Sequence, residues 1–390
     1  MLKRGAAAAI APFLVMDVIA RANARQAALA PGAPGIIRME VGQPGTGAPR
    51  GAVQAASRAL LAGEPLGYTE AFGLRSLREA ISRHYGRFYD GLALAPDRIA
   101  VTTGASGGFL LAFLSAFDIG DRIAMAAPYY PPYLNILHAL GMVPVVLPTA
   151  ASTRFQPTIA MLERLAAREG LPDGLIVASP CNPAGTMLQA VDLAALAQWC
   201  DTHGVRLVSD EIYHGLTWDF PAATAASFSD SAIVINSFSK YWSMTGWRVG
   251  WMVLPHDLLG AAERLKQNMF ISAPHISQVA AEAAFACTDE ITANLARYRR
   301  SRDFLLHELP QVGFPALSPA QGAFYLYADI SQHGSDSLSF ADRILETAGV
   351  AVTPGIDFDA ERGHEFLRFS YCGPEADMRE APSRLALLGA

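Results

Sequence analysis

The chain has 390 residues, of which 51% are hydrophobic and 17% are charged. This length and hydrophobic content allow two subdomains with cores of their own and exclude a disordered chain. The net charge of −6 comes from interspersed acidic and basic residues, without a block of lysine or arginine that would bind nucleic acid or lipid. We therefore expect a globular protein with no nucleic-acid partner and no membrane partner.

The cysteine pattern argues against a disulfide framework and against metal binding. Cys181, Cys200, Cys287 and Cys372 lie far apart, and no pair has the CxxC spacing. This pattern favours reduced thiols in a cytoplasmic protein over a disulfide framework or a zinc site. No apolar stretch is long enough to span a bilayer.

The N-terminal segment allows two interpretations. Two basic residues precede an alanine-rich stretch at 6–20, and the small residues 22–24 follow, as in a secretory signal with its cleavage site. Asp17 and Pro12, however, interrupt the apolar stretch. The same residues also predict an amphipathic helix that begins after Pro12, and we favour this helix.

Strands and helices alternate over the first two thirds of the chain. Apolar and β-branched runs predict strands at 36–41, 99–103, 122–127, 143–147, 175–180, 205–209 and 232–235, and apolar spacing predicts helices at 52–62, 74–81 and 109–117. From residue 261 the pattern becomes helical, notably at 280–285 and 291–309, before strands at 322–327, 350–353 and 366–371. This change indicates passage from an α/β sheet to a smaller C-terminal domain.

A glycine-rich turn at 104–108 joins a predicted strand to a predicted helix. Backbone N–H groups at a helix N-terminus, with the helix dipole behind them, form an anion site without a charged side chain. The other glycine-rich turn, at 42–47, is not placed between a predicted strand and a predicted helix, and its sequence predicts only a connecting loop.

Polar residues follow two other predicted strands. Strand 205–209 runs into Asp210-Glu211-Ile212-Tyr213, and a carboxylate at the end of a buried strand is costly unless it meets a cation or a proton donor. Strand 175–180 runs into Cys181-Asn182-Pro183-Ala184-Gly185, which by itself predicts only a turn.

The segment after strand 232–235 carries Ser237, Lys240 and Arg248. The ends of buried parallel strands are where α/β folds place their chemistry. A lysine that is desolvated beside a second cation has a lowered pKa and can form an imine with a carbonyl compound. Ser237 and Arg248 offer hydrogen-bond donors to a phosphate. The alternative is a surface lysine whose stem covers apolar side chains.

Ser237-Phe-Ser-Lys240, followed by Gly246-Trp-Arg248-Val-Gly250, resembles the cofactor-binding lysine segment of the class I/II aminotransferases of fold type I, which use pyridoxal phosphate. The motifs described above extend the resemblance over almost the whole chain. It implies an α/β fold-type I enzyme with a mostly parallel, doubly wound sheet in a large cofactor-binding domain at 43–282. It also implies a smaller α+β domain built from both termini, 1–42 and 283–390.

The resemblance assigns catalytic roles to Lys240, Asp210 and Tyr213. In this family the lysine carries pyridoxal 5'-phosphate, the aspartate pairs with the ring nitrogen, and the tyrosine and Asn182 contact the phenolic oxygen. An aromatic residue at the position of Tyr130 stacks on the ring, although the tyrosines around it would otherwise be taken as packing residues. The phosphate is expected to lie among Gly104, Ala105, Ser106, Ser237 and Arg248. The family more often has threonine in place of Ala184.

The resemblance also predicts the substrate contacts and a dimer. Arg368 matches the arginine that binds the substrate α-carboxylate through two parallel hydrogen bonds, although an arginine in a strand is more commonly solvated. Gly42 and Asn182 are expected beside the same carboxylate, because a residue without Cβ lets the backbone approach. Tyr68 resembles the tyrosine that crosses the interface to the partner's cofactor phosphate, which predicts a homodimer with composite sites. The N-terminal helix is expected to close over the site, which favours the cytoplasm.

The predicted reaction is transfer of the amino group of an L-amino acid to a 2-oxo acid by way of pyridoxamine phosphate. Relatives that act on dicarboxylic amino acids carry a basic residue near the turn occupied here by Ser106 and glycines, so we expect a neutral or aromatic donor. The alternative is a β-eliminating lyase of the C–S type, which needs the same lysine, aspartate and arginine. A regulator without turnover is disfavoured because no DNA-binding segment precedes residue 36. A nicotinamide dinucleotide site is disfavoured because the turns lack the required acidic residue and spacing.

Overall fold

A computed structural model describes residues 2–334 and 336–389 of the chain. Its main layer is a seven-stranded sheet with the order β2-β8-β7-β6-β5-β3-β4. The neighbours from β4 to β7 pair in parallel, whereas β8 lies antiparallel to both β2 and β7. The strands are β2 (Ile99–Thr102), β3 (Arg122–Ala127), β4 (Val143–Pro148), β5 (Gly174–Ala178), β6 (Arg206–Asp210), β7 (Ile233–Ser237) and β8 (Gly250–Val253).

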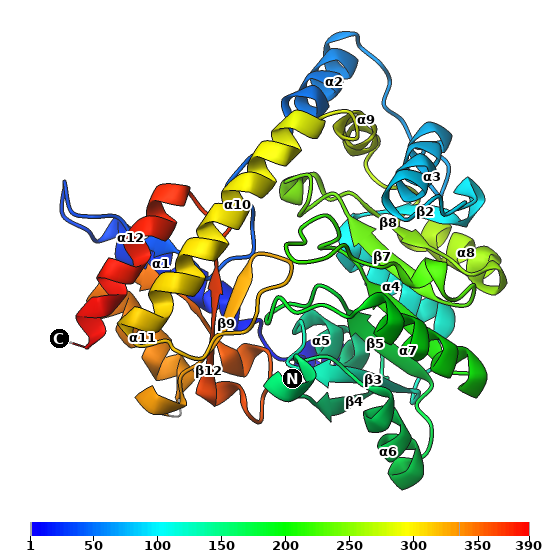
Figure 1. Cartoon of the computed structure of the whole chain (residues 1–390). Helices are drawn as coiled ribbons and strands as arrows, with labels where there is room; N and C mark the ends of the chain where they lie inside the picture. The colour runs from blue at the N-terminus through cyan, green and yellow to red at the C-terminus, as the bar shows by residue number, and fades with distance from the viewer. Residues whose placement is uncertain (1, 335, 390) are drawn as a thin grey trace.

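Helices cover both faces of this sheet (Figure 1). Successive residues of a strand point to opposite faces, and Leu207 and Val208 of β6 accordingly belong to two different apolar cores. The helices on the side of Leu207 are α2 (Arg50–Leu61), α3 (Arg75–Phe88), α6 (Ile159–Glu169), α7 (Ala190–His203) and α9 (His275–Ala284), and those on the side of Val208 are α4 (Gly104–Ala116), α5 (Pro132–Ala139) and α8 (Leu259–Met269). The predicted doubly wound α/β sheet is therefore confirmed.

Two smaller sheets lie to one side of the large sheet (Figure 1). An antiparallel sheet has the order β11-β12-β9, and β1 pairs in parallel with β10. These strands are β1 (Ile37–Arg38), β9 (Tyr325–Asp329), β10 (Val350–Ala351), β11 (Thr353–Pro354) and β12 (Phe366–Ser370), and the helices beside them are α1 (Leu14–Ala27), α10 (Thr288–Glu308), α11 (Ser337–Ala348) and α12 (Glu375–Leu385). Leu367 and Phe369 enter the core of this part, while Arg368 lines a cavity, as the alternation along the strand predicted.

Several element boundaries differ from the sequence-based expectation, and two of these differences concern segments that carry motifs. The glycine-rich turn is the first turn of α4, which begins at Gly104 and not at residue 109. Gly104 has φ +74°, a value that residues with a Cβ rarely adopt, so the glycine allows the chain to leave β2 and enter the helix at once. The expected strand at 350–353 is divided, because Val350–Ala351 pairs with β1 whereas Thr353–Pro354 pairs with β12.

The predicted N-terminal helix is present as α1. Its first backbone N–H groups are capped by a distant residue: Leu14 N and Val15 N donate to the two carboxylate oxygens of Asp357 at 3.1 and 3.2 Å. Asp357 ends a short 3-10 helix, Gly355–Asp357, that follows β11. Farther along, Arg21 of α1 pairs with Asp342 of α11. The α1 helix is thus bound to the part of the chain that carries the smaller sheets.

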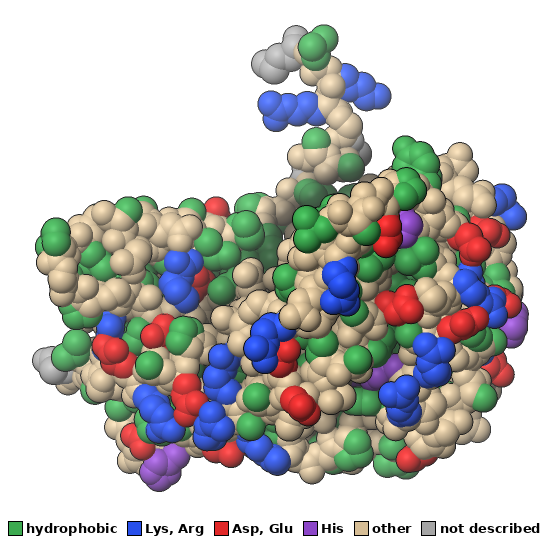
Figure 2. All heavy atoms as spheres, turned by 90° about the horizontal axis from the view of Figure 1, so that it is seen from above, with side chains coloured by type: hydrophobic (Ala, Val, Ile, Leu, Met, Phe, Trp, Pro, Cys, Tyr) green, Lys and Arg blue, Asp and Glu red, His purple; other side chains and the backbone are tan. Residues whose placement is uncertain are grey.

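The surface carries mixed charge. On the face shown in Figure 2, basic and acidic side chains are interspersed. Within residues 2–334 and 336–389, no helix has both the length and the apolar character needed to cross a membrane. The same residues contain no group of three or more histidine, cysteine, aspartate or glutamate side chains placed to hold a metal ion.

Candidate active site

A cavity of about 430 Å³ lies where the large sheet, the smaller sheets and α1 meet. The parallel strands β5 and β6 bring Ala178 and Asp210 to it from their carboxyl ends. The β12 strand contributes Arg368 from the other side. Residues from distant parts of the sequence therefore meet around one cavity, at the edge where parallel α/β sheets bind their ligands.

Lys240 lies three residues beyond β7, and its side chain lines the cavity. Its Nζ donates a hydrogen bond to the backbone oxygen of Gly42 at 2.7 Å. Burial lowers the pKa of Lys240 to about 8; the cations Arg368 and Arg248 also lower it, while the Cys372 thiol and Asp210 oppose the shift. At pH 7 about a tenth of the amine is therefore neutral and nucleophilic, far more than for an ordinary lysine.

Asp210, the last residue of β6, is held by two donors. The hydroxyl of Tyr133 donates to its Oδ2, and the backbone N–H of Ile212 donates to its Oδ1 at 3.1 Å. Burial raises the pKa of Asp210 to about 6, against the effect of the Tyr133 and Ile212 hydrogen bonds and of the Lys240 charge. The group is largely ionised at neutral pH, and its oxygens can still accept a hydrogen bond from a cation in the cavity.

Tyr213 and Tyr325 share a hydrogen bond, with their hydroxyl oxygens 2.7 Å apart. Gly42 makes this pair possible, because a Cβ at Gly42 would lie 1.8 Å from the Tyr325 hydroxyl oxygen. The absence of a side chain at Gly42 was expected to serve the approach of a substrate carboxylate. The contact that the structure shows is with Tyr325, and the Gly42 carbonyl receives the Lys240 amine.

Arg368 is 3% exposed, so it is not the solvated side chain that strand arginines usually are. Its guanidinium carbon lies 4.5 Å from the ring centre of Tyr325 and 4.7 Å from that of Phe358. Nη1 donates to Asn182 Oδ1 at 2.8 Å, and Nη2 donates to Thr353 Oγ1 at 3.1 Å. Nε is buried and has no partner among the described residues. A planar cation with an unused buried donor suits a carboxylate ligand.

Asn182 lines the cavity directly after β5. Because its Oδ1 accepts from Arg368, its amide nitrogen remains as the hydrogen-bond donor of the side chain. The donor role that the family resemblance implies for Asn182 stays a prediction.

An anion cradle lies at the N-terminus of α4. Ala105 and Ser106 line the cavity there, and Arg248 lies beside them. Arg248 Nη1 donates to the backbone oxygen of Thr245 at 2.9 Å. A Cβ at Gly104 would lie 2.5 Å from Arg248 Nη2, so this residue must be glycine for the guanidinium to come so close to the helix end. Helix N–H groups, a hydroxyl and a guanidinium together suit a phosphate.

Ser237, a predicted phosphate ligand, does not line this cavity, and Tyr68 was predicted to act in a partner's site. The Ser237 hydroxyl is fully buried, 3.1 Å from the Val249 oxygen, and it accepts a hydrogen bond from Ser239 N; the serine that lines the cavity is Ser239. Tyr68 is 82% exposed and does not line the cavity of its own chain. Tyr130 lines the cavity as expected, with its ring edge-on to Phe13 at 6.0 Å.

Several cavity residues were missed by sequence reasoning. Tyr133 belongs to the tyrosine segment 129–133, from which only Tyr130 was singled out, and Tyr325 was read only as part of a strand. The N-terminal helix was expected at the site, but the individual side chains with which the residues before and within α1 form a wall of the cavity were not predicted. They are apolar and comprise Phe13, Val15, Met16 and Ile19. The sequence signal for Tyr325 was its place near the start of a strand beside a glycine-rich turn.

Comparison with known proteins identifies the family. The profile described as "Aminotransferase class I and II" matches residues 34–385, and the chain belongs to this family. Its members are pyridoxal phosphate enzymes. The protein is an aminotransferase that moves an amino group between an amino acid and a 2-oxo acid, and its fold is that of the fold-type I aminotransferases.

Three similar proteins illustrate the range of the family. A valine–pyruvate aminotransferase of Mycobacterium tuberculosis is 47% identical over 382 residues, which cover 97% of this chain and 96% of the relative. A crystal structure of an aminotransferase from the same species superposes with a TM-score of 0.95 at 45% identity, with full coverage of both chains. An aspartate aminotransferase of Thermus thermophilus, solved with maleate, has a TM-score of 0.90 at 30% identity, and the match covers 99% of each chain.

Proposed function

We propose that this aminotransferase binds pyridoxal 5'-phosphate covalently at Lys240 and uses a neutral aliphatic amino acid, with valine as the first candidate, as the donor to pyruvate. The observation that carries the proposal is the meeting of Lys240, Asp210 and Arg368 around one cavity with the anion cradle of α4 at its edge. An amine with a lowered pKa, a buried carboxylate, a carboxylate-binding guanidinium and a phosphate cradle are the four groups that such a cofactor and substrate require.

The roles of the residues follow from their contacts. Asp210, which accepts a hydrogen bond from Tyr133, would accept a second one from the ring nitrogen of the cofactor, and Asn182 and Tyr213 would donate to its phenolic oxygen. Tyr130 would lie against the ring. Gly104, Ala105, Ser106, Ser239 and Arg248 would hold the phosphate, and Ser237 would support Ser239. The cofactor, when bound, supplies an electron sink for the substrate Cα.

Lys240 and Arg368 act on the substrate. Arg368 binds the α-carboxylate, with Asn182 and Gly42 beside it, and so fixes the position of Cα. The Lys240 amine takes the proton from Cα and later returns a proton, which its lowered pKa permits at neutral pH.

The apolar wall supports a neutral donor. Phe13, Val15, Met16 and Ile19 line the cavity, and the cations that line it among the described residues are Lys240, Arg248 and Arg368. Each of these three cations already has a role in cofactor or α-carboxylate binding. A second carboxylate on the substrate would therefore meet an apolar surface of the chain, at a high desolvation cost. The name of the valine–pyruvate relative agrees with this reading.

A domain division and a homodimer complete the proposal. All seven strands of the large sheet lie within 43–282, whereas β1 and the strands from β9 onward lie outside this range. We therefore assign 43–282 to the cofactor-binding domain and 1–42 with 283–390 to the small domain. Tyr68, exposed and remote from its own cavity, is free to reach the cofactor phosphate of a second copy.

A substrate panel tests the proposed donor and acceptor. Purified holoenzyme is mixed with valine, other aliphatic and aromatic amino acids, aspartate and glutamate, each with pyruvate or 2-oxoglutarate. We expect kcat/KM for valine with pyruvate to exceed that for aspartate by at least about 100-fold. Placing the side-chain carboxylate of aspartate against the apolar wall costs several kcal/mol of desolvation free energy. Equal or faster turnover of aspartate would contradict the proposed specificity. Release of ammonia and pyruvate from cysteine would instead indicate the eliminating lyase.

The pH dependence of cofactor capture tests the state of Lys240. Only the neutral amine attacks the aldehyde, so the second-order rate constant for capture by the apoenzyme should rise with pH and level off above about pH 8, the pKa of Lys240. Stopped-flow absorbance measures this rate, and Nα-acetyl-lysine serves as the reference amine. A midpoint near the ordinary lysine pKa of about 10.4 would contradict the proposed environment.

A further inference from the structure

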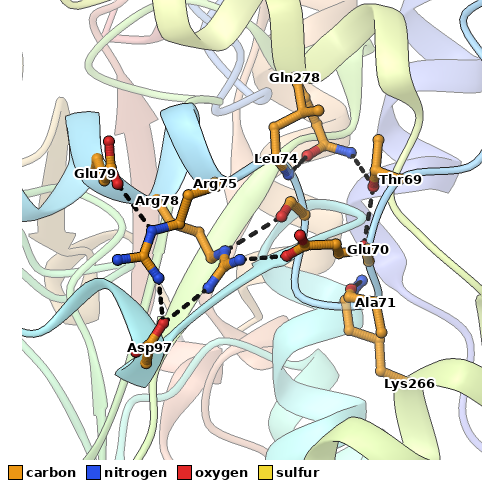
Figure 3. A network of polar contacts seen from close by, with 11 residues as sticks. Thr69, Glu70, Ala71, Leu74, Arg75, Arg78, Glu79, Asp97, Lys266 and Gln278 are labelled. Atoms are coloured by element: carbon orange, nitrogen blue, oxygen red, sulfur yellow. Dashed lines mark hydrogen bonds and ion pairs between the residues drawn. The ribbon is translucent and has the colours of Figure 1, made fainter.

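The segment 67–74, between α2 and α3, exposes one large aromatic side chain while most of its backbone is fixed. Tyr68 is 82% exposed, yet its neighbours are held by side chains from α3, α8 and α9 (Figure 3). A surface loop normally hydrogen-bonds to water and remains mobile. Buried side chains bind this loop, and a loop that only connects two helices would not need such contacts.

Lys266 of α8 makes one of these contacts. Its side chain is 1% exposed, and its Nζ donates to the backbone oxygen of Ala71 (Figure 3). Burial lowers the pKa of Lys266 to about 8. Lysine is among the residues least often buried, because its charge and its flexible stem both oppose burial. A leucine or methionine in the same place would pack in the core without the free-energy cost of burying a charged group.

Gln278 of α9 contacts the same segment at two positions, Thr69 and Leu74. Its Oε1 accepts from Leu74 N at 2.8 Å, and its Nε2 donates to Thr69 Oγ1 at 3.2 Å (Figure 3). Gly73 between them has φ +93°, and a Cβ there would lie 2.7 Å from Gln278 Oε1.

Arg78 of α3 completes the set of contacts. Its Nε donates to the Gly73 oxygen at 3.2 Å, and its Nη2 pairs with the Glu70 carboxylate. Side chains from three helices thus fix the part of the segment that follows Tyr68, from Thr69 to Leu74.

We propose that Lys266 and Gln278 are positioning residues for Tyr68: they hold segment 67–74 in the shape that presents the Tyr68 hydroxyl to the phosphate site of a second copy of this chain. The inference rests on the proposed homodimer with composite sites. A segment that is ordered when the chain folds does not lose conformational freedom again when the cofactor binds. The buried contacts therefore act on cofactor affinity through Tyr68, although neither residue touches the cofactor.

A double-mutant cycle on cofactor affinity tests the inference. Apoenzymes of the wild type, Tyr68→Phe, Lys266→Met and the double variant are titrated with pyridoxal 5'-phosphate, followed by absorbance. Tyr68→Phe should raise Kd roughly 10-fold, the effect of one lost hydrogen bond to a charged group. Lys266→Met should raise Kd roughly 3- to 10-fold, and the double variant should bind no more weakly than Tyr68→Phe alone, because both changes remove the same contact.

Controls separate positioning from stability. Arg75→Met alters a neighbour of Arg78 whose ion pairs, within the described residues, are with Glu79 and Asp97, both outside the segment, and it should leave Kd unchanged. The unfolding temperature and the dimer mass are measured for every variant. Thr69→Val, which removes the hydroxyl that accepts from Gln278 and donates to the Glu70 oxygen, replaces Lys266→Met in the cycle if that variant does not fold.

The possible outcomes are distinguishable. Non-additive losses in Kd support the inference. If Tyr68→Phe raises Kd but neither Lys266→Met nor Thr69→Val does, the inference is overturned and the composite site stands. Fully additive losses in Kd have the same meaning. An unchanged Kd in Tyr68→Phe overturns the composite site itself, and the inference with it.

Discussion

The Lys240→Ala variant is expected to lose covalent cofactor binding and at least about 10⁴-fold in turnover, because the substitution removes both the attachment point and the proton-transfer group. The side chain lines the cavity and makes a single hydrogen bond, to the Gly42 oxygen, so its removal should leave the fold intact. Absorbance spectra of the purified protein before and after addition of the cofactor, together with steady-state rates, measure both effects.

The control for this experiment is the folded state of the variant. Circular dichroism and the unfolding temperature should match those of the wild-type apoenzyme. A Lys240→Ala protein that retains the visible absorbance of the bound cofactor and near-normal turnover would refute the assignment of the lysine.

The Arg368→Lys variant is expected to lose roughly 100-fold in kcat/KM for amino acids, equivalent to about 3 kcal/mol, since lysine cannot form the planar two-point contact with a carboxylate. The loss should also reflect packing, because the guanidinium lies between the rings of Tyr325 and Phe358. Steady-state kinetics with the best amino donor from the substrate panel measures the effect.

Two controls show whether the α-carboxylate is the cause. An amine donor without a carboxylate should lose little, so equal losses for amines and amino acids would make Arg368 a structural residue. Arg362→Lys offers a matched substitution in the same region: Arg362 pairs with Asp359 and does not line the active-site cavity. This variant should retain nearly full activity.

Much of the site could be predicted because each polar residue follows its own strand. Asp210 ends β6, Asn182 follows β5 and Lys240 follows β7, and parallel strands bring such positions to one edge of a sheet. Local sequence patterns and the order of the strands are therefore enough to predict that these residues lie close together. The alternation in β12 likewise predicted that Arg368 lies opposite Leu367.

The contacts that could not be predicted join residues far apart in the sequence. The Tyr133 hydroxyl reaches Asp210 across 77 positions, and Leu14 finds its helix cap in Asp357 after 343. The choice of Ser239 over Ser237 as the serine that faces the cavity depends on a side-chain rotation and on the position of the Val249 oxygen. No local pattern encodes such pairings, because they depend on how whole elements pack.

The most direct test of the account is to locate the covalent bond to the cofactor. The holoenzyme is treated with borohydride, which reduces an imine to a stable amine, then digested, and the peptides are examined by mass spectrometry. We predict that the phosphopyridoxyl group is found on the peptide that contains Lys240, on that residue and in stoichiometric amount. Modification at Lys266 or another lysine, or an unmodified Lys240 peptide from active enzyme, would contradict the account.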